Sequence, residues 1–513
     1  MRWFATLAGR LRLLLQVSLF AFVVPSASAK AAWITAEAGN FEVFSSASEE
    51  RTHQILQDLV DFRSTLLRFM KLPPGFEPRC TVVVFGDARE FEAYKPLFNG
   101  KPKDVAGFFT GGTDMVMIAL SPGRDEESVR RLVYHEYMHQ LLFSRGISLP
   151  LWLNEGLAEY FSTFAVKKNR VLLGRAIEGH VAFLNWAKPM PLPELFAVQE
   201  GSADYNEGIR QGIFYAESWA LVHYLMSGRN SEYPKALNKY LQVLMVHGRH
   251  RDPGFAAVTG IDVALLEREL RKYLRSGRYN LYELEGALRP TENALPVEFR
   301  AAPEMEKDCA LWQLRWLSQR DAVCNYELLS LSKRMPDSPR PFEALGGNAW
   351  RSEEPDQALE YWAKAAARGS RNAFIHTQLA RTPVEAMLHY LDLSYRLPAA
   401  KCDELRDLLV KALAIEPDYG DALTLLAIVE AFAENPRPAN INLVQRGTAK
   451  IRDPRRFHLA LAIIRWRFGD HATCRKLVDG LLKVAKDDSV LMTMAQRLDE
   501  ELNENVPAEN RGE

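Results

Sequence analysis

The amino-acid sequence predicts an α+β domain, with a mixed sheet and a helical subdomain, followed by an all-α repeat domain. In residues 30–161, short apolar runs typical of buried strands alternate with amphipathic stretches typical of helices. From residue 162 to residue 288 the apolar spacing is helical. After residue 305 helix follows helix, with small and aromatic residues at recurring positions, a pattern typical of stacked helix pairs.

A secretory signal peptide is expected in residues 1–29. Three arginines precede the apolar run Leu13–Val24, and Ala27-Ser28-Ala29 offers the small residues that a signal peptidase recognises. A run of about a dozen apolar residues is too short to span a bilayer, although an uncleaved membrane anchor stays open as an alternative. We therefore expect a mature chain from Lys30 that is periplasmic or secreted and has no integral membrane segment.

The net charge bears on the class of partner, and the cysteine count bears on whether the fold depends on disulfides. Lys and Arg number 64 and Asp and Glu 65, for a formal net charge of -1, so electrostatics give no reason to expect binding to nucleic acid. Five cysteines are few for a chain of 513 residues. Small secreted domains that depend on disulfides have a much higher proportion of cysteine. Cys309 and Cys324 are close enough in sequence to pair, and the sequence leaves that question open.

Four elements are expected ahead of the candidate site. They are a strand at Phe41–Phe44, an amphipathic helix at Glu49–Met70, a buried strand at Thr81–Phe85 and a strand at Asp114–Leu120. The last strand leads into an amphipathic helix. An acidic cluster marks the start of this helix and Gly146 its end, which are typical helix boundaries.

The motif His135-Glu136-Tyr137-Met138-His139 lies in the middle of that helix. Positions four apart share one face of an α-helix, so His135 and His139 can direct two imidazoles at one point, with Glu136 beside them. Two imidazoles at this spacing with an adjacent carboxylate are typical of a zinc site that carries its own general base. The alternative is a solvated helix whose His and Glu residues are ordinary surface groups.

A second predicted helix supplies further carboxylates. Glu155 and Glu159 follow Asn154 at helical spacing. A catalytic zinc ion takes three protein ligands and a water molecule. Glu155 is therefore the expected third ligand beside His135 and His139, and we expect one zinc ion per chain.

The two motifs together resemble the gluzincin metallopeptidases, and among them the bacterial peptidase MA-like families that pair HExxH with a Trp-Leu-Asn-Glu-Gly-Leu-Ala-Glu-Tyr-Phe block. In this chain the block reads Trp152–Phe161 without a gap. The resemblance implies a thermolysin-like core, with the two histidines and Glu155 as zinc ligands and Glu136 as the general base. It also implies that Glu159 holds His135 through the free ring nitrogen, a contact that orients a ligand imidazole.

The resemblance also assigns a role to the strand before the zinc helix. In gluzincins the strand at the place of Asp114–Leu120 is the sheet edge along which an extended peptide pairs, which is a general way to hold peptide backbone. An edge strand that binds nothing is the alternative. Aminopeptidases of this class carry a Gly-x-Met-Glu-Asn motif here, whose Glu captures the free amine of the substrate. This chain reads Gly-Gly-Thr-Asp-Met at residues 111–115 instead, so exopeptidase action is unsupported.

Tyr215 is a further candidate for catalysis. The segment Phe214–Leu225 resembles the stretch of gluzincins in which a Tyr hydroxyl reaches the zinc site. A donor at that place can stabilise the negative charge that develops on the carbonyl oxygen of the substrate. The alternative is an aromatic residue on a core-facing helix stripe. His223 is the reserve candidate, although a lone His on an apolar face is usually a core residue.

The C-terminal part resembles tetratricopeptide repeats. We expect a linker at residues 289–304, a degenerate helical solenoid at 305–502 and a disordered polar tail at 503–513. The residues that carry the resemblance are Phe342, Leu345, Gly346, Ala358, Trp362 and Ala365 in one unit, Ala412 and Pro417 in a second, and Gly469, Cys474 and Val478 in a third. Such a stack presents a concave face to peptides or partner proteins.

The sequence therefore predicts an exported zinc-dependent endopeptidase whose residues 30–288 suffice for the chemistry, while the repeat domain recruits a substrate or partner protein. Two alternatives stay open. One is a catalytically idle zinc domain that serves as a binding scaffold; Glu136 argues against it, because a structural zinc site needs no base. The other is a zinc hydrolase that acts on a non-peptide amide or ester.

Overall fold

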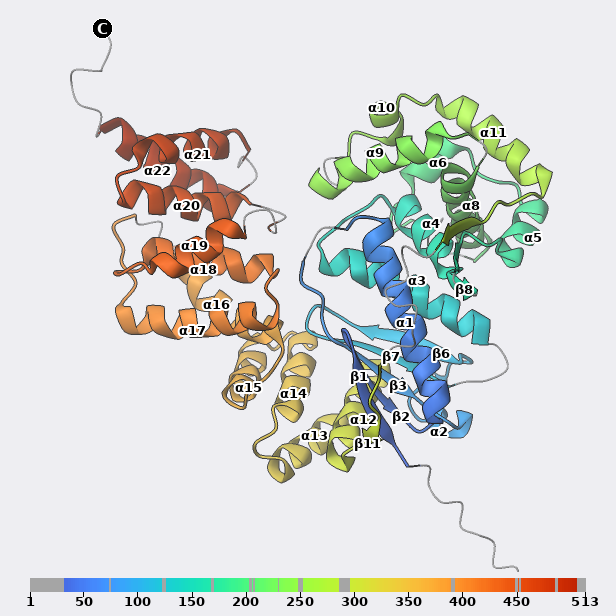
Figure 1. Ribbon diagram of the computed structural model, residues 1–513, viewed down its shortest axis with the longest axis horizontal. Helices are drawn as coiled ribbons and strands as arrows, with labels where there is room; N and C mark the ends of the chain where they lie inside the picture. The colour runs from blue at the N-terminus through green and yellow to red at the C-terminus, as the bar shows by residue number, and fades with distance from the viewer. Residues whose placement is uncertain are drawn as a thin grey trace, which may run out of the picture.

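A computed structural model describes residues 32–504, apart from short gaps at 73–74, 122–125, 168–169, 203–204, 206–207, 229, 248–251, 286–295, 389–392, 448–450, 452–453 and 485–487. The expected signal peptide and nearly all of the expected tail lie outside the described residues. The described chain consists of an α+β part followed by a long helical array (Figure 1). The coarse fold class predicted from the sequence is therefore confirmed.

A six-stranded mixed sheet forms the centre of the N-terminal part. Its strands, in spatial order, are β11 (Arg300–Ala301), β1 (Ile34–Ala38), β2 (Phe41–Ser45), β3 (Cys80–Val84), β7 (Val116–Leu120) and β6 (Gly107–Gly111). Strands β2, β3 and β7 run parallel, whereas β1, β6 and β11 pair antiparallel with their neighbours. Val43, Val82 and Ile118 lie side by side across the parallel strands, and all three are fully buried. The strands predicted near residues 41, 81 and 116 are confirmed.

The sheet edge beside the helix that carries the HExxH motif is β6, so the prediction that Asp114–Leu120 forms this edge is wrong. β7, which occupies most of that range, lies between β3 and β6. Glycines at both ends of β6 mask its strand pattern in the sequence, because glycine is depleted in strands. The strand is nevertheless formed, because it folds back on β7 as the first arm of a hairpin.

The flanking hydrogen bonds show which backbone groups of β6 face outwards. Ser121 N donates to Ala106 O at 3.0 Å, and paired residues of an antiparallel ladder exchange hydrogen bonds at every second position. The backbone groups of Gly107, Phe109 and Gly111 therefore face away from β7. Among the described residues they have no hydrogen-bond partner.

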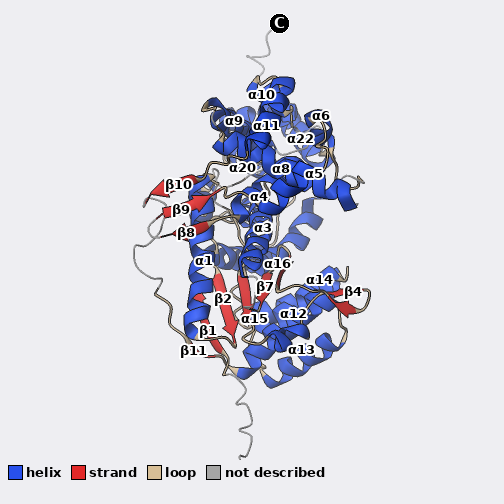
Figure 2. Cartoon of the chain, turned by 90° about the vertical axis from the view of Figure 1, so that its right-hand side faces the viewer, coloured by secondary structure: helices blue, strands red, loops and turns tan. Residues whose placement is uncertain are grey.

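Helices cover both faces of the sheet (Figure 2). The other elements of this part are α1 (Glu49–Phe69), α2 (Ala88–Glu92), a hairpin of β4 (Leu97–Phe98) and β5 (Lys101–Pro102), and α3 (Glu126–Ser144). The predicted helix at residues 49–70 is confirmed as α1, which packs with α3 on one face. On the other face lies α12 (Glu304–Gln319), whose Leu311 and Leu314 belong to one apolar cluster with Phe44 and Met117 of the sheet. The first helix after the expected linker is thus a layer of the sheet domain.

A helical subdomain follows α3. Its helices are α4 (Leu151–Ser162), α5 (Glu178–Trp186), α6 (Leu192–Ala197), α8 (Gly208–Ser227), α9 (Glu232–His247), α10 (Phe255–Thr259) and α11 (Val263–Ser276). It also contains a three-stranded sheet of β8 (Ala165–Lys167), β9 (Arg170–Leu173) and β10 (Tyr282–Glu285). The purely helical pattern expected for residues 162–288 is wrong in this respect, because strands of three or four residues are too short to interrupt a helical spacing recognisably.

The helical array completes the chain. It comprises α12 and then α13 (Val323–Arg334), α14 (Arg340–Arg351), α15 (Pro355–Ala367), α16 (Ala373–Leu388), α17 (Ala399–Ile415), α18 (Gly420–Phe432), α19 (Pro438–Arg446), α20 (Arg455–Arg467), α21 (His471–Val484) and α22 (Ser489–Glu504). Gly346 permits the close crossing of α14 and α15, since a Cβ there would lie 2.3 Å from the indole of Trp362. Helix pairs are thus stacked as the repeat pattern predicts.

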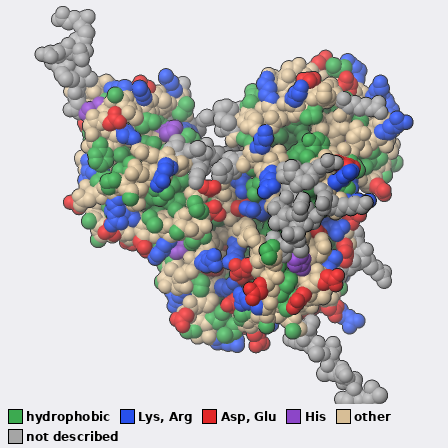
Figure 3. All heavy atoms as spheres, viewed as in Figure 1, with side chains coloured by type: hydrophobic (Ala, Val, Ile, Leu, Met, Phe, Trp, Pro, Cys, Tyr) green, Lys and Arg blue, Asp and Glu red, His purple; other side chains and the backbone are tan. Residues whose placement is uncertain are grey.

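The array and the helical subdomain rise on opposite sides of the sheet (Figure 1), and the surface is hollowed between them on the face in Figure 3. Acidic and basic side chains are interspersed on that face. All five cysteines are buried and unpaired, so Cys309 and Cys324 form no bridge. Among the described residues, every helix is too short or too polar to span a lipid bilayer.

Candidate metal centre

Packing against the sheet domain fixes the orientation of α3. Tyr134, Met138 and Leu141 are buried along one side of this helix, and the ring of Tyr134 stacks on Phe62 of α1 with ring centroids 4.2 Å apart. The two histidines and the glutamate of the HExxH motif lie half buried on the open side. The helical spacing of the motif therefore places all three polar groups where they can meet a second element.

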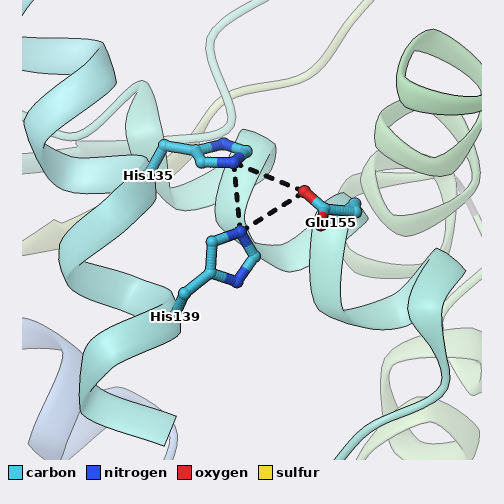
Figure 4. Close-up of side chains that lie close together, drawn as sticks. All are labelled: His135, His139 and Glu155. Atoms are coloured by element: carbon cyan, nitrogen blue, oxygen red, sulfur yellow. Dashed lines mark hydrogen bonds and ion pairs between the residues drawn. The ribbon is translucent and has the colours of Figure 1, made fainter. Parts of the chain in front are cut away.

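That second element is α4, and Gly156 sets its position. A Cβ at Gly156 would lie 2.4 Å from the backbone oxygen of Ser218 on α8, so only glycine allows α4 and α8 to approach this closely. Glu155, the preceding residue, is 3% exposed and points toward the two histidines of α3 (Figure 4). The close helix crossing thus carries a buried carboxylate to the HExxH face.

The three predicted ligands converge on one point (Figure 4). Nε2 of His135 and Nε2 of His139 lie 3.1 Å apart, and each lies 3.3 Å from Oε2 of Glu155. Ligand atoms about 2.0–2.1 Å from a tetrahedral zinc ion would be separated by roughly 3.3–3.4 Å. Oε2 of Glu155 is buried and has no hydrogen-bond partner among the described residues. The donor set and its spacing therefore fit a metal ion in tetrahedral coordination.

The charged forms of Glu155 and His135 stabilise each other. Burial alone would raise the pKa of the Glu155 carboxyl, but the adjacent imidazoles of His135 and His139 outweigh burial and lower it to about 2. Burial alone would lower the pKa of His135, but Glu155 and Glu159 outweigh burial and raise it. A negative carboxylate between two imidazoles is the arrangement that a bound cation would replace with direct coordination.

Glu159 lies behind His135, one turn along α4 from Glu155. Its Oε1 is 3.6 Å from Nδ1 of His135, and its Oε2 is 3.3 Å from both Arg131 and His180. Burial favours the neutral form of Glu159, but His180, His135 and Arg131 outweigh it and lower the pKa. The structure thus places a charged carboxylate where it can fix the ring orientation and tautomer of His135. No sequence pattern pointed to His180, which lies on α5 outside both motifs.

Tyr205 is a site residue that the sequence did not reveal. Its hydroxyl donates to Oε1 of Glu155 at 3.1 Å. This is the carboxylate oxygen that does not face the histidines, so the contact leaves Oε2 oriented toward them. Tyr205 lies between α6 and α8, 50 residues from Glu155, and nothing local in the sequence marks it as a partner of the site.

Tyr215 lies next to the predicted ligands. Its ring centroid is 6.5 Å from that of His135, and it stacks on Tyr205 with centroids 5.9 Å apart. Burial, and then the nearby Glu155, raise the pKa of Tyr215 above the ordinary tyrosine value. The hydroxyl therefore keeps its proton at neutral pH and can act as a hydrogen-bond donor.

Glu136 and His223 differ in what surrounds them. Glu136 is half buried beside the histidines and has no hydrogen-bond or ion-pair partner among the described residues, so it is available to a bound molecule. His223 is fully buried, with Nε2 2.7 Å from the oxygen of Gly174 and Nδ1 3.0 Å from the hydroxyl of Tyr273. Burial lowers the pKa of His223 to about 4. It is a satisfied core residue, as expected for a lone His on an apolar face.

Comparison with known proteins connects this site with one family. No curated protein matches the chain. One family model matches a segment that covers residues 131–144 of α3, all of α4 and all of α8, and so includes His135, Glu155, Tyr205 and Tyr215. Residues 131–243 of this chain thus match the family described as "Protein of unknown function (DUF1570)".

Proposed function

We propose that this protein is an exported zinc-dependent metallopeptidase that cleaves peptide bonds within a chain. The observation that carries the proposal is the convergence of His135, His139 and Glu155 at tetrahedral spacing with Glu136, an unpaired carboxylate, beside them. A structural metal site would close its fourth position with a protein ligand and would need no base. The signal-peptide pattern supports a periplasmic or secreted location.

The residues around the triad have the properties that peptide hydrolysis requires. A zinc ion held by the triad would supply a Lewis acid and lower the pKa of a water molecule to near neutrality. Glu136 is placed to accept a proton during attack and to return one to the leaving amine. Tyr215, which keeps its proton, is placed to donate a hydrogen bond to the negative charge that develops on the carbonyl oxygen.

The open edge of β6 offers a way to hold the substrate. Phe109 and Gly111 present backbone donors and acceptors along this edge, whereas Gly107 is buried. An extended peptide can pair with such an edge as an added strand. Because the contacts are made by backbone groups, this mode of binding suits an unfolded segment with little sequence selection.

Two features favour internal cleavage of a protein substrate. Asp114, the acidic residue of the β6–β7 turn, is buried and pairs with Arg351 of α14, so its charge is not available to capture a substrate amine. The stacked helices beyond the sheet provide a surface for recruiting a substrate or partner protein. The recruiting surface would suit a binding scaffold equally well, so the unpaired Glu136 is the feature that favours an enzyme. Neither feature favours hydrolysis of a non-peptide amide or ester.

The test is cleavage of a denatured, fluorescently labelled protein by the purified mature chain. We expect activity that a chelator abolishes and that zinc restores. Glu136→Gln should keep its zinc and lose activity by about 10²–10⁴-fold, because it removes the proton acceptor without removing a ligand. Zinc-loaded protein that cleaves no peptide bond in such a mixture would overturn the proposal.

A further inference from the structure

The β6–β7 turn is held by the helical array. Nη1 of Arg351 donates to Oδ2 of Asp114 at 3.0 Å, and Nη2 donates to Oδ1 of the same carboxylate. Asn372, which precedes α16, donates its side-chain amide to the backbone oxygen of Asp114 at 2.8 Å. The side chains of Asp114 and Arg351 are 5% and 12% exposed. A buried two-pronged ion pair of this kind has strict geometry, and removing one partner leaves the other charge buried without a counter-charge.

The same turn also contacts the metal-ligand helix. Gln140, the residue after His139 on α3, donates its side-chain amide to the backbone oxygen of Gly112 at 3.3 Å. At the other end of β6, Gly107 packs against Val129 near the start of α3. Strand β6 therefore runs alongside α3, and its turn joins the helix next to one of the metal ligands.

A second loop links the array to α3 independently. Phe76, between α1 and β3, stacks on Tyr419 at the start of α18 with ring centroids 4.2 Å apart. The next residue, Glu77, accepts hydrogen bonds from Arg63 of α1 and from the hydroxyl of Tyr137, which lies between the two histidines in sequence. The array thus contacts two loops, and each of these loops contacts α3 within the HExxH motif or next to it.

We infer that Asp114 and Arg351 are positioning residues: through the β6–β7 turn, the helical array holds the substrate edge β6 in fixed register with the metal-ligand helix. This inference rests on the proposed function, because it concerns the same site. It assigns the array a part in turnover as well as in recruitment. Misplacement of a bound peptide by about 1 Å relative to the catalytic groups can cost 10²-fold in rate, so loosening the turn should lower kcat.

The chain offers a matched control on the same helix. Arg340, at the other end of α14, makes the same kind of two-pronged pair with Glu42 of β2, whose side chain is 3% exposed. Strand β2 is separated from β6 by β3 and β7, so this pair docks the array without touching the turn. Arg340→Gln therefore weakens docking, whereas Arg351→Gln weakens docking and releases the turn.

The first measurement is amide hydrogen exchange of the full-length, metal-free chain, which does not depend on any activity. In Arg351→Gln, exchange should rise by about tenfold or more in residues 107–120 and around Gln140. In Arg340→Gln it should stay unchanged there. Asp114→Asn, which keeps the side-chain volume, should reproduce the effect and serves if Arg351→Gln does not fold. Unchanged exchange in both turn variants, or an equal rise in Arg340→Gln, would overturn the inference.

The second measurement is cleavage of a short unstructured peptide, too small to reach the concave face of the array. Arg351→Gln should lower kcat by about tenfold while it keeps the zinc content of the native protein, and Arg351→Lys should recover part of the loss because it keeps the charge. Arg340→Gln should change kcat little. A loss confined to KM would overturn the inference. Absence of cleavage by the native chain would instead refute the proposed function and leave the exchange result to decide on the turn.

Discussion

Tyr205 donates its hydroxyl to Oε1 of Glu155 across 3.1 Å, while Oε2 of the same carboxylate faces His135 and His139 at 3.3 Å. Tyr205 thus contacts one carboxylate oxygen of Glu155, and the two histidines contact the other. A carboxylate with one oxygen tied to a hydrogen-bond donor has one oxygen and one orientation left for a metal ion.

Tyr205→Phe should therefore weaken zinc binding by roughly 10–100-fold, which is the usual effect of removing a hydrogen bond to a ligand. The measurement is competition with a fluorescent zinc chelator at neutral pH. Tyr273→Phe, which removes a buried hydroxyl from His223, is the control and should leave the affinity unchanged. Equal affinities for Tyr205→Phe and the native protein would show that the contact does not orient the ligand.

The metal content of the purified chain tests the ligand set directly. We expect one zinc ion per chain in the native protein and almost none in His139→Ala, because two remaining ligands hold the ion too weakly to survive dialysis. His471→Ala, an exposed residue of α21, serves as the control. Zinc content that is the same in both variants would end the assignment of His139.

Glu155 and Glu159 should differ in the size of their effects. Glu155→Ala removes a ligand and should nearly abolish zinc binding, whereas Glu159→Ala removes the group behind His135 and should weaken binding by about 10–100-fold. Titration of both metal-free variants with zinc gives the two affinities. If Glu159→Ala lost more affinity than Glu155→Ala, the wrong carboxylate would have been named as the ligand.

The raised pKa of Glu217 on α8 predicts that the free energy of unfolding depends on pH. Burial raises its pKa from 4.5 to about 8. Because the folded-state value lies above the unfolded one, the folded state binds more protons between pH 4.5 and 8, and stability falls as the pH rises through this window. Glu217→Gln, which resembles the protonated form, should stabilise the protein by a few kcal/mol at pH 8 and little at pH 5. Urea unfolding at both pH values is the measurement, and an equal change at both would contradict the assigned pKa.

The packing of α12 changes what is expected of a shortened chain. The sequence pattern suggested that residues 30–288 would fold alone and cut a short peptide, but the apolar face that carries Phe44 and Met117 is covered by α12. A chain that ends at residue 288 would expose this face, so we expect it to bind a hydrophobic dye and to self-associate. Size-exclusion chromatography and dye fluorescence measure this. A monomeric shortened chain with cooperative unfolding would show that the face needs no cover.

The features that the sequence predicted best are those encoded over short distances. Helix α1 has 21 residues of consistent periodicity, and the HExxH and Trp152–Phe161 blocks each specify one face of one helix. The distance between His139 and Glu155 could not be read from the chain, but the block around Glu155 suggested that it faces α3, and the structure brings the two within 3.3 Å.

The features that the sequence did not predict depend on contacts between distant residues. The place of β6 at the edge follows from strand order, which no local pattern contains. Tyr205 and His180 reach the site from segments outside the motifs. Arg351 and Asp114 are 237 residues apart, and in sequence each looks like an ordinary charged residue. Such pairs are decided by tertiary packing, so a single sequence gives them no signature.

The antiparallel pairing of β1 with β11 has a consequence for the order in which the molecule is completed. A chain that emerges with its N-terminus first presents His135, His139 and Glu155 well before β11, α12 and Arg351 are available. The metal ligands can assemble locally at that stage. Strand β11, helix α12 and the Arg351 side chain that holds the β6–β7 turn arrive last. Under the positioning role inferred for Arg351, a partly emerged chain holds its ligands without an aligned substrate edge. If the proposed peptidase activity holds, a chain whose C-terminal helices have not yet docked would cut neighbouring unfolded chains about tenfold more slowly than the complete molecule.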